Sequence, residues 1–264
     1  MTQLNKQNKD PVSQIESGNP WYTDKQFVQQ LGTPGRRAVI ENRWRIFGDA
    51  IAGWTSRNTF EHRIAPVRIL DIGCGDGINL HGITQAIGIS QWNLLLFGVD
   101  YNPLRLNRAR AINGVNGLLL GSLPRLPFSS ETFDIILCNH VLEHIFDDEE
   151  ALQELNRLLR RDGIMILGVP NEGCLLAKLR NRILQPQIAR TTDHVQFYTT
   201  AILAERTMSA GFRIIQMYRE GFFMPHLRVK NWLREKTFGR AILSACRALL
   251  PSQAAELVGI FSKN

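Results

Sequence analysis

A short apolar segment followed by a glycine-rich turn constrains the fold of this 264-residue chain more than any other feature. Residues 67–72 form an apolar run, and Gly73, Gly75 and Gly77 follow at alternate positions before a helix-compatible stretch. This order predicts a buried strand that delivers the backbone into a tight turn at the N-terminus of a helix. Glycines remove side chains from the turn, so a ligand can lie directly against the main chain. The motif therefore predicts a nucleotide-like ligand at the end of a strand.

Strand-like and helix-like segments alternate along most of the chain. Apolar runs that predict strands occupy residues 67–72, 93–99, 117–120, 133–138, 164–169, 212–218 and 257–261. Segments with helical character lie between them, at residues 77–88, 104–111, 149–161 and 199–208. Strands that alternate with helices in this way predict a parallel sheet covered by helices. We expect an α/β fold: a Rossmann-like, doubly wound, mostly parallel seven-stranded sheet with helices on both faces.

The segment before this core has a polar arm and an amphipathic helix. Residues 1–20 are polar and contain helix breakers, which predicts a flexible arm. Between residues 36 and 57 the apolar positions recur with helical spacing, at Ile40, Trp44, Phe47, Ile51 and Trp54. Such a helix can pack its aromatic stripe on the sheet or cover the ligand as a lid, and we favour packing.

Four regions are expected from these patterns. They are a flexible N-terminal arm (1–20), an N-terminal helical cover (21–64), a ligand-binding core (65–220) and a basic amphipathic extension that ends in a final strand (221–264).

Positive charge is concentrated in the second half of the chain. Residues 1–150 hold 14 Lys/Arg against 16 Asp/Glu, whereas residues 151–264 hold 17 against 8. A basic half can meet phosphate groups on nucleic acid, anionic lipid or a phosphorylated acceptor, or it can be a solvated surface. The N-terminus lacks the apolar core of a signal peptide, no apolar run approaches 18 residues, and the four cysteines form no CxxC pair. We expect a cytoplasmic protein, with peripheral membrane contact through the basic region as an option.

The identity of the nucleotide depends on the residues around the turn. A dinucleotide motif needs a glycine where this chain has Ile78, which disfavours a nicotinamide-dependent oxidoreductase. Asp71 precedes the turn, and a carboxylate there suits a cationic aminoacyl nucleoside better than a pyrophosphate. Asp100 lies 29 residues further on, at the end of the second strand, where an acidic residue binds ribose hydroxyls in doubly wound folds. Its alternative role is to cap a helix that begins near Pro103.

The motifs resemble those of class I S-adenosylmethionine-dependent methyltransferases. The matching segments, in the family's order, are residues 67–77, 98–100, 121–128, 133–134, 139–144 and 158–163. The resemblance covers residues 65–220 and is closest to the small-molecule O-methyltransferase branch, including the ubiquinone-biosynthesis type. It implies a methyltransferase with S-adenosyl-L-methionine as its cofactor.

The resemblance also implies roles for individual residues. Asp71, Gly73 and Gly75 would hold the methionine part, and Asp100 the ribose hydroxyls. The remaining cofactor contacts implied are Cys74, Tyr101, Ser122, Leu123 and Asn139. Ser122 and Leu123 would meet the adenine edge, although the family often has Asp at the Ser122 position, and a hydroxyl is a weaker acceptor than a carboxylate.

Transfer to an oxygen benefits from a general base, and histidine titrates near neutral pH. The candidates are His194, His144 and His140. His194 is favoured because it lies at the end of a basic segment (171–195) that we expect at the sheet edge. His144 can equally be a core or helix-capping residue. We expect no metal; the alternative is a divalent ion at His140, Glu143 and His144, positions that hold one in the ubiquinone-type enzymes.

The acceptor is expected to be a small molecule, a saccharide or a lipid-like compound, methylated at oxygen. A nucleic-acid methyltransferase is the first alternative, but residues 139–142 lack the Pro-Pro-aromatic signature of base amino methylation. The second alternative is a module that binds the cofactor without catalysis.

Overall fold

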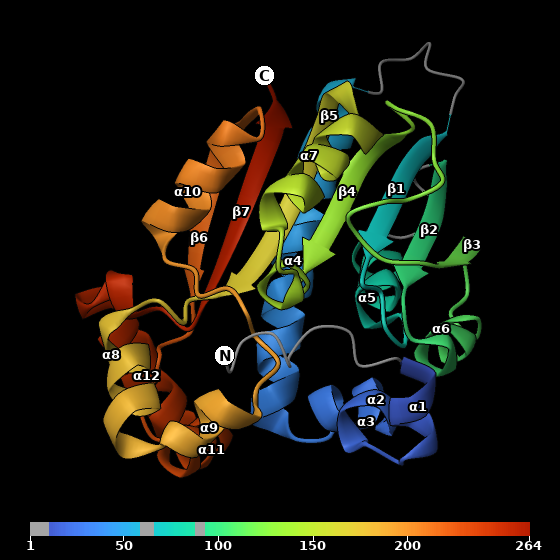
Figure 1. Ribbon diagram of the computed structural model, residues 1–264. Coiled ribbons are helices and arrows are strands. Elements are labelled where there is room, and N and C mark those ends of the chain that lie inside the picture. Colours follow the sequence, from blue (N-terminus) through green and yellow to red (C-terminus); the bar gives the residue numbers. More distant parts are fainter. Residues whose placement is uncertain (1–10, 59–65, 88–92) are drawn as a thin grey trace.

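Seven strands form one sheet in the order β3-β2-β1-β4-β5-β7-β6 (Figure 1). The computed structural model describes residues 11–58, 66–87 and 93–264. The strands are β1 (Val67–Ile72), β2 (Leu94–Asp100), β3 (Val115–Leu120), β4 (Phe133–Asn139), β5 (Leu159–Pro170), β6 (Phe212–Glu220) and β7 (Glu256–Lys263). β1 to β5 pair in parallel, and β7 is antiparallel to both β5 and β6. The expected Rossmann-like, mostly parallel sheet is confirmed.

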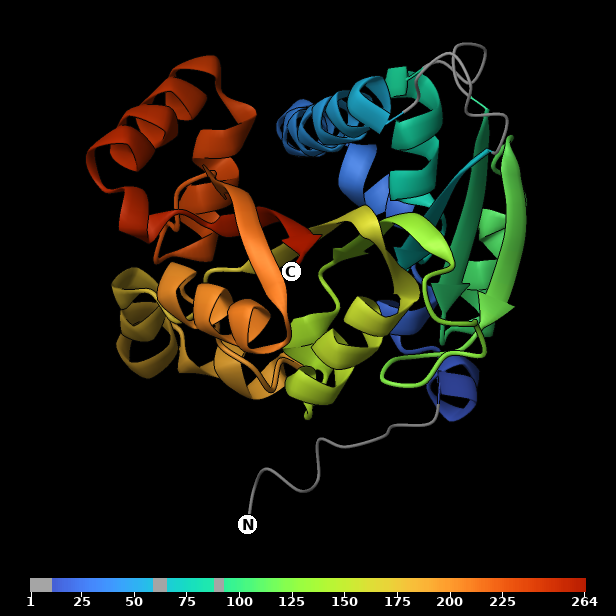
Figure 2. The same ribbon diagram turned by 90° about the horizontal axis from the view of Figure 1, so that it is seen from above.

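Helices cover both faces of the sheet and its carboxyl edge (Figures 1 and 2). The helices along the faces are α4 (Pro34–Asn58), α5 (Ile78–Ile87), α6 (Pro103–Ala109), α7 (Asp148–Leu158) and α10 (Thr200–Ser209). One group at the carboxyl edge contains α1 (Pro11–Glu16), α2 (Pro20–Thr23) and α3 (Gln26–Leu31). The other contains α8 (Leu175–Leu179), the π-helical turn η3 (Arg180–Leu184), α9 (Pro186–Thr191), α11 (Leu227–Glu235) and α12 (Thr237–Leu249). Short 3-10 turns are η2 (Leu142–His144) and η4 (Pro251–Gln253). None of the described helices combines the length and apolar character needed to cross a bilayer.

The sheet separates two apolar cores. Successive residues of a strand point to opposite faces, so Ile135 and Leu137 of β4 join one core while Ile136 and Cys138 join the other. Side chains of α4, α5 and α6 complete the first core, and those of α7 and α10 complete the second. Burial on both faces explains why β1 and β4 read as continuous apolar runs.

Helix α4 packs on the sheet, as its aromatic stripe predicts. Phe47, Ile51 and Trp54 are fully buried, and the Trp54 Nε1 donates a hydrogen bond of 2.6 Å to the carbonyl of Asp162. Trp44 is half-buried and lies against Gly82 of α5, where any side chain would overlap the indole ring. The C-terminal part of α4 is therefore a core helix.

Three sequence predictions need correction. Residues 159–161 were expected at the end of a helix, but α7 ends at Leu158 and Leu159 begins β5, where it pairs with Phe133. The leucine spacing suits a helix, yet a buried residue at the start of a strand satisfies the same pattern. The final strand predicted at residues 257–261 is confirmed as β7, but it lies inside the sheet between β5 and β6 and not in an extension outside the core.

The third correction concerns the arm, because α1 and α2 are helical where residues 1–20 were expected to be flexible. Contacts that are distant in sequence hold this region: the Asn102 side chain donates to the Tyr22 carbonyl at 3.0 Å, and Arg108 donates to the Thr23 carbonyl at 2.7 Å. Residues 1–10, and most of the expected segment 59–64, lie outside the described residues.

The packing of α4 gives a stability prediction. Replacing Phe47 by Ala should lower the free energy of unfolding by about 3–5 kcal/mol, since it leaves a cavity in a buried core. Val39→Ala, at an exposed position of the same helix, should change it by less than about 0.5 kcal/mol. Urea unfolding of the two variants measures the difference. Small and equal effects would show that α4 is a separable lid.

Candidate active site

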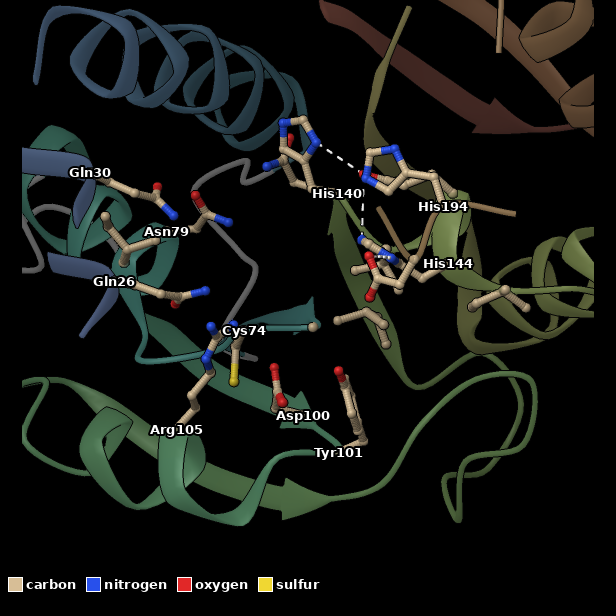
Figure 3. A pocket seen from close by; sticks show the side chains of 18 of the residues that line it. Gln26, Gln30, Cys74, Asn79, Asp100, Tyr101, Arg105, His140, His144 and His194 are labelled. Atoms are coloured by element: carbon tan, nitrogen blue, oxygen red, sulfur yellow. Dashed lines mark hydrogen bonds and ion pairs between the residues drawn. The ribbon is translucent and has the colours of Figure 1, made fainter. Parts of the chain in front are cut away.

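A cavity of about 1300 Å³ lies at the carboxyl ends of β1, β2 and β4 (Figure 3). Its walls extend from Tyr22 in α2 to Arg234 in α11, so both helical groups at the sheet edge contribute. The strand order reverses between β1 and β4, and ligands of open α/β sheets bind at such a point. The volume exceeds that of ordinary small-molecule pockets, about 300–1,000 Å³. The cavity therefore has room for a nucleoside cofactor together with an acceptor.

The glycine turn forms one wall of the cavity. Gly73 and Gly75 have φ angles of +68° and +54°, which favour glycine. A Cβ on Gly73 would lie 2.3 Å from a methyl of Val141, and one on Gly75 would overlap the side chain of Gln26. The turn thus has no space for side chains, and α5 begins directly after it at Ile78. This arrangement confirms the predicted strand, turn and helix.

Helix α3 is attached to the glycine turn by a reciprocal pair of hydrogen bonds. The backbone N–H of Gln26 donates to Asp76 Oδ2 at 2.8 Å, and the backbone N–H of Asp76 donates to Gln26 Oε1 at 2.8 Å. Gln26, Gln29 and Gln30 also line the cavity. No sequence pattern pointed to these glutamines, because the contact joins residues 50 positions apart.

Asp100 connects β2 to the glycine turn. Its Oδ2 accepts a hydrogen bond of 2.7 Å from the Gly75 N–H, and its Oδ1 accepts one of 2.8 Å from the Asn102 N–H. Helix α6 is capped by the Asn102 side chain, which accepts from Leu104 and Arg105. The alternative role of Asp100 as the cap is therefore wrong. Its carboxylate lines the cavity, with lone pairs left for a hydroxyl-bearing ligand.

Asp71 lies beneath the glycine turn rather than on the cavity wall. It is fully buried, and neither carboxylate oxygen has a hydrogen-bond partner of regular geometry among the described residues. Burial, together with the neighbouring Asp100, raises the pKa of Asp71 to about 8. A cationic ligand bound above the turn would favour the charged form of this carboxyl.

The other implied cofactor contacts surround the same space. Cys74, Tyr101, Ser122, Leu123 and Asn139 all line the cavity. Burial raises the pKa of the Cys74 thiol, so this cysteine is an uncharged wall. The Asn139 Oδ1 has no hydrogen-bond partner among the described residues. Gly75 itself is not among the residues that line the cavity, because the side chain of Gln26 packs against it.

His140 is held between two carboxylates at the end of β4. Its Nδ1 lies 3.1 Å from Glu143 Oε1, and its Nε2 lies 3.2 Å from Glu256 Oε1. Burial alone would lower the pKa of His140, but Glu256 and Glu143 outweigh it and raise the pKa to about 9. The imidazole is therefore protonated at neutral pH and cannot accept a proton there.

His144 and His194 lie side by side, with ring centroids 4.8 Å apart (Figure 3). His144 Nδ1 is 3.2 Å from Asp193 Oδ1, and His194 Nδ1 is 2.7 Å from Glu172 Oε2. Backbone hydrogen bonds from Val195 and Gln196 to the Glu143 carbonyl fix this segment against η2. The structure thus brings all three predicted histidines to one part of the cavity.

The carboxylates beside these two histidines are charged. Burial would raise the pKa of Glu172, but His194 and Arg180, the latter 2.8 Å away, lower it to about 2. His144 has a raised pKa, because Asp193 and Glu143 outweigh the effect of burial. Glu172 and Asp193 were not predicted, since only the fold brings them to the histidines.

The residues that could hold a metal ion differ from the set that the sequence suggested, which was His140, Glu143 and His144. Glu143, His144 and His194 offer ligand atoms that lie within 4.8 Å of one another. His140 is not in this group, and carboxylates lie beside both of its ring nitrogens. Imidazole and carboxylate ligands suit a divalent transition metal. The ion pair with Asp193 and the hydrogen bond with Glu172 orient the two histidines without one.

Comparison with known proteins agrees with this geometry. A family described as a methyltransferase domain matches residues 70–167. A probable S-adenosylmethionine-dependent methyltransferase of Mycolicibacterium smegmatis is 26% identical over 58% of this chain and 54% of its own length. A ubiquinone biosynthesis O-methyltransferase of Haemophilus ducreyi is 30% identical over 39% of this chain and 45% of its own. The chain thus spans about half the length of these curated relatives.

Solved structures share the fold. A putative sarcosine dimethylglycine methyltransferase from Galdieria sulphuraria has a TM-score of 0.58 at 15% identity, covering 84% of this chain and 86% of its own. A 1,6-didemethyltoxoflavin-N1-methyltransferase from Burkholderia thailandensis, solved with S-adenosylhomocysteine, has a TM-score of 0.53 at 15% identity, covering 96% and 85%. With the motifs, the family match and the curated relatives show that residues 70–167 form an S-adenosylmethionine-dependent methyltransferase domain, and the solved class I methyltransferases share its fold.

Proposed function

We propose that this protein transfers the methyl group of S-adenosylmethionine to an oxygen atom of a small-molecule acceptor. The observation that carries the proposal is one cavity with two chemically different ends: the glycine turn with Asp100, and the histidine–carboxylate pairs. Relatives named as O-methyltransferases of ubiquinone biosynthesis and of malonyl-[acyl-carrier protein] support an oxygen acceptor.

The cofactor end is assigned to the residues implied by the family resemblance. Asp100 binds the ribose hydroxyls, the backbone of Gly73 and Cys74 faces the methionine part, and Ser122 with Leu123 meets the adenine. The buried Asp71 stabilises the positive charge of the ligand from below the turn. S-adenosylmethionine supplies an already activated methyl group, so the protein has only to align the acceptor, exclude water and remove a proton.

His194 is the proposed general base. Glu172 accepts the Nδ1–H of the ring, so the neutral tautomer has its lone pair on Nε2, where it can take the proton of an acceptor hydroxyl. The charged Glu172 then stabilises the imidazolium that forms. His140 is unsuited to this role because its pKa is about 9. His144, which packs on His194 and has a raised pKa, is assigned to positioning.

The acceptor end combines apolar and cationic groups. Val39 and Ile40 of α4 line it together with Arg36, Arg43 and Arg234. Arg43 is neutralised by Glu256 at 3.1 Å, whereas burial and Arg36 lower the pKa of Arg234. Such walls suit an acceptor that has an apolar body and an anionic group, and we place it among the lipid-like or saccharide acceptors. The absence of a Pro-Pro-aromatic sequence after Asn139 continues to disfavour nucleic acid bases.

Cofactor binding should release a proton. With a pKa of about 8, the Asp71 carboxyl of the free protein is mainly neutral at pH 7, and a cationic ligand favours its ionised form. The affinity for S-adenosylmethionine should therefore rise with pH towards 8 and level off above it. Calorimetry in buffers of different ionisation enthalpy measures the released proton. Asp71→Asn should abolish this release, and an unchanged release in that variant would contradict the assignment.

Removing the proposed base should separate binding from turnover. A screen with methyl-labelled cofactor over quinols, sugars and lipids identifies the acceptor. With it, His194→Ala should reduce turnover by about 10²–10⁴-fold, the usual contribution of a general base, without weakening cofactor binding. His226→Ala, at a histidine outside the cavity wall, is the control. Full turnover in His194→Ala would remove this residue from the mechanism, and cofactor binding with no transfer to any acceptor would favour a non-catalytic module.

A further inference from the structure

Helix α12 turns its apolar side towards solvent. Phe238, Ile242 and Leu249 follow one another at spacings of four and seven, so they form one stripe on the helix, and their exposed fractions are 54%, 47% and 80%. Gly239, about 80° away from the stripe around the helix, packs so closely that an added Cβ would overlap the Leu233 carbonyl. A helix on a globular protein ordinarily directs its apolar stripe into the core. In α12 the stripe is exposed to solvent instead.

Neighbouring helices extend this apolar surface. Trp232 of α11 packs edge-to-face on Phe238, with ring centroids 5.6 Å apart, and both side chains are exposed. The η3 turn joins α11 through Gln185, whose Oε1 accepts the Leu227 N–H at 2.9 Å. Eleven of the twenty large apolar side chains found exposed in the described residues lie here: Leu175, Leu179, Ile183, Leu184, Leu227, Val229, Trp232, Phe238, Ile242, Leu249 and Leu250. We call these eleven side chains the α8–α12 surface; its helices lie at one end of the molecule (Figures 1 and 2).

The charge around the α8–α12 surface is almost entirely positive. Residues 173–188 and 221–255 contain nine Lys/Arg and a single acidic residue, Glu235. That carboxylate is occupied, since it accepts hydrogen bonds from Thr33 Oγ1 at 2.8 Å and from the Gly35 N–H at 3.0 Å. The exposed cations are Lys178, Arg182, Arg228 and Lys236.

This combination identifies the partner by its chemistry. A second copy of the chain would place the same surface against itself and bring like charges together. An anionic bilayer accepts aliphatic side chains at the boundary of headgroups and acyl chains, accommodates Trp at the interface and attracts Lys and Arg. We propose that the α8–α12 surface docks the protein on an anionic membrane.

The docking surface adjoins the acceptor end of the cavity. Arg234 of α11 lines the cavity, and Glu235 fastens the end of α11 to the start of α4. A molecule that leaves the bilayer at α11 therefore meets the cationic wall of the active site. This consequence rests on the proposed function and deepens it, because it makes the acceptor an amphipathic lipid-like molecule. The docking itself does not depend on catalysis.

Vesicle flotation tests the docking without any acceptor. The full chain, loaded with S-adenosylhomocysteine, is mixed with vesicles of phosphatidylcholine alone or with added phosphatidylglycerol. It should float only with the anionic vesicles, and salt should weaken binding. Ile242→Ser with Leu249→Ser should reduce partitioning by about tenfold or more, because two apolar anchors are lost. Arg228→Glu should reduce it by at least about fivefold.

The matched control is Met208→Ser, which removes a side chain of similar exposure from α10, outside the surface. It should float like the wild type, and all variants should keep wild-type affinity for S-adenosylhomocysteine. Absence of flotation with anionic vesicles, or equal flotation of the Ile242/Leu249 variant and the wild type, would overturn the proposal. So would dimerisation through α12, or tight salt-sensitive RNA binding that the same substitutions abolish while vesicles are ignored. Loss of methyl transfer with intact flotation would instead refute only the proposed function.

Discussion

The hydrogen bond from the Gly75 N–H to Asp100 Oδ2, 2.7 Å long, is the contact on which the site depends. It joins the turn after β1 to the end of β2 and so fixes the glycine backbone next to the proposed ribose-binding carboxylate. Gly75 needs a positive φ to present its N–H in this direction, and Gln26 occupies the space where a side chain would lie. Helix α3 covers the turn and is bound to it by the hydrogen bonds between Gln26 and Asp76. The turn, the carboxylate and the covering helix are thus joined in one hydrogen-bonded unit, to which the Asn102 N–H also donates.

The rest of the molecule divides between the two ends of the cavity. Helices α1 to α3 lie at the cofactor end, where α3 bonds to the glycine turn, while α4 and α11 line the acceptor end with cationic and apolar side chains. β7 makes this possible, because it enters the sheet beside β5 and places Glu256 against His140 and Arg43. Nine of the 17 Lys/Arg of residues 151–264 lie in residues 173–188 and 221–255, the region that adjoins the acceptor end through Arg234. A protein with this asymmetry can bind its donor from solution and its acceptor at a charged surface.

Local patterns predicted the strands, the glycine turn, α4 and the position of Asp100. The periodicity of apolar residues and the spacing of glycines can both be seen within a short segment. The end of α7 was mistaken because Leu159 fits a helical stripe as well as a buried strand. The carboxylate partners of the histidines could not be found in this way. Glu172 lies 22 residues from His194, and Glu256 lies 116 from His140, so only the packing of the chain brings them together. Gln26 could not be found from local patterns for the same reason. Helices α1 and α2 were missed as well, because contacts with Asn102 and Arg108, which are distant in sequence, hold this region.

The most direct test of this account is a calorimetric titration with S-adenosylmethionine, and with NAD⁺ for comparison. The wild-type protein should bind S-adenosylmethionine and not NAD⁺. Asp100→Asn should bind S-adenosylmethionine about tenfold to a hundredfold more weakly, because a charge-assisted hydrogen bond is lost, while the surface variant Asp49→Asn binds normally. Equal binding of NAD⁺, or unchanged affinity in a folded Asp100→Asn protein, would contradict the assignment of the glycine turn and Asp100 as the cofactor site.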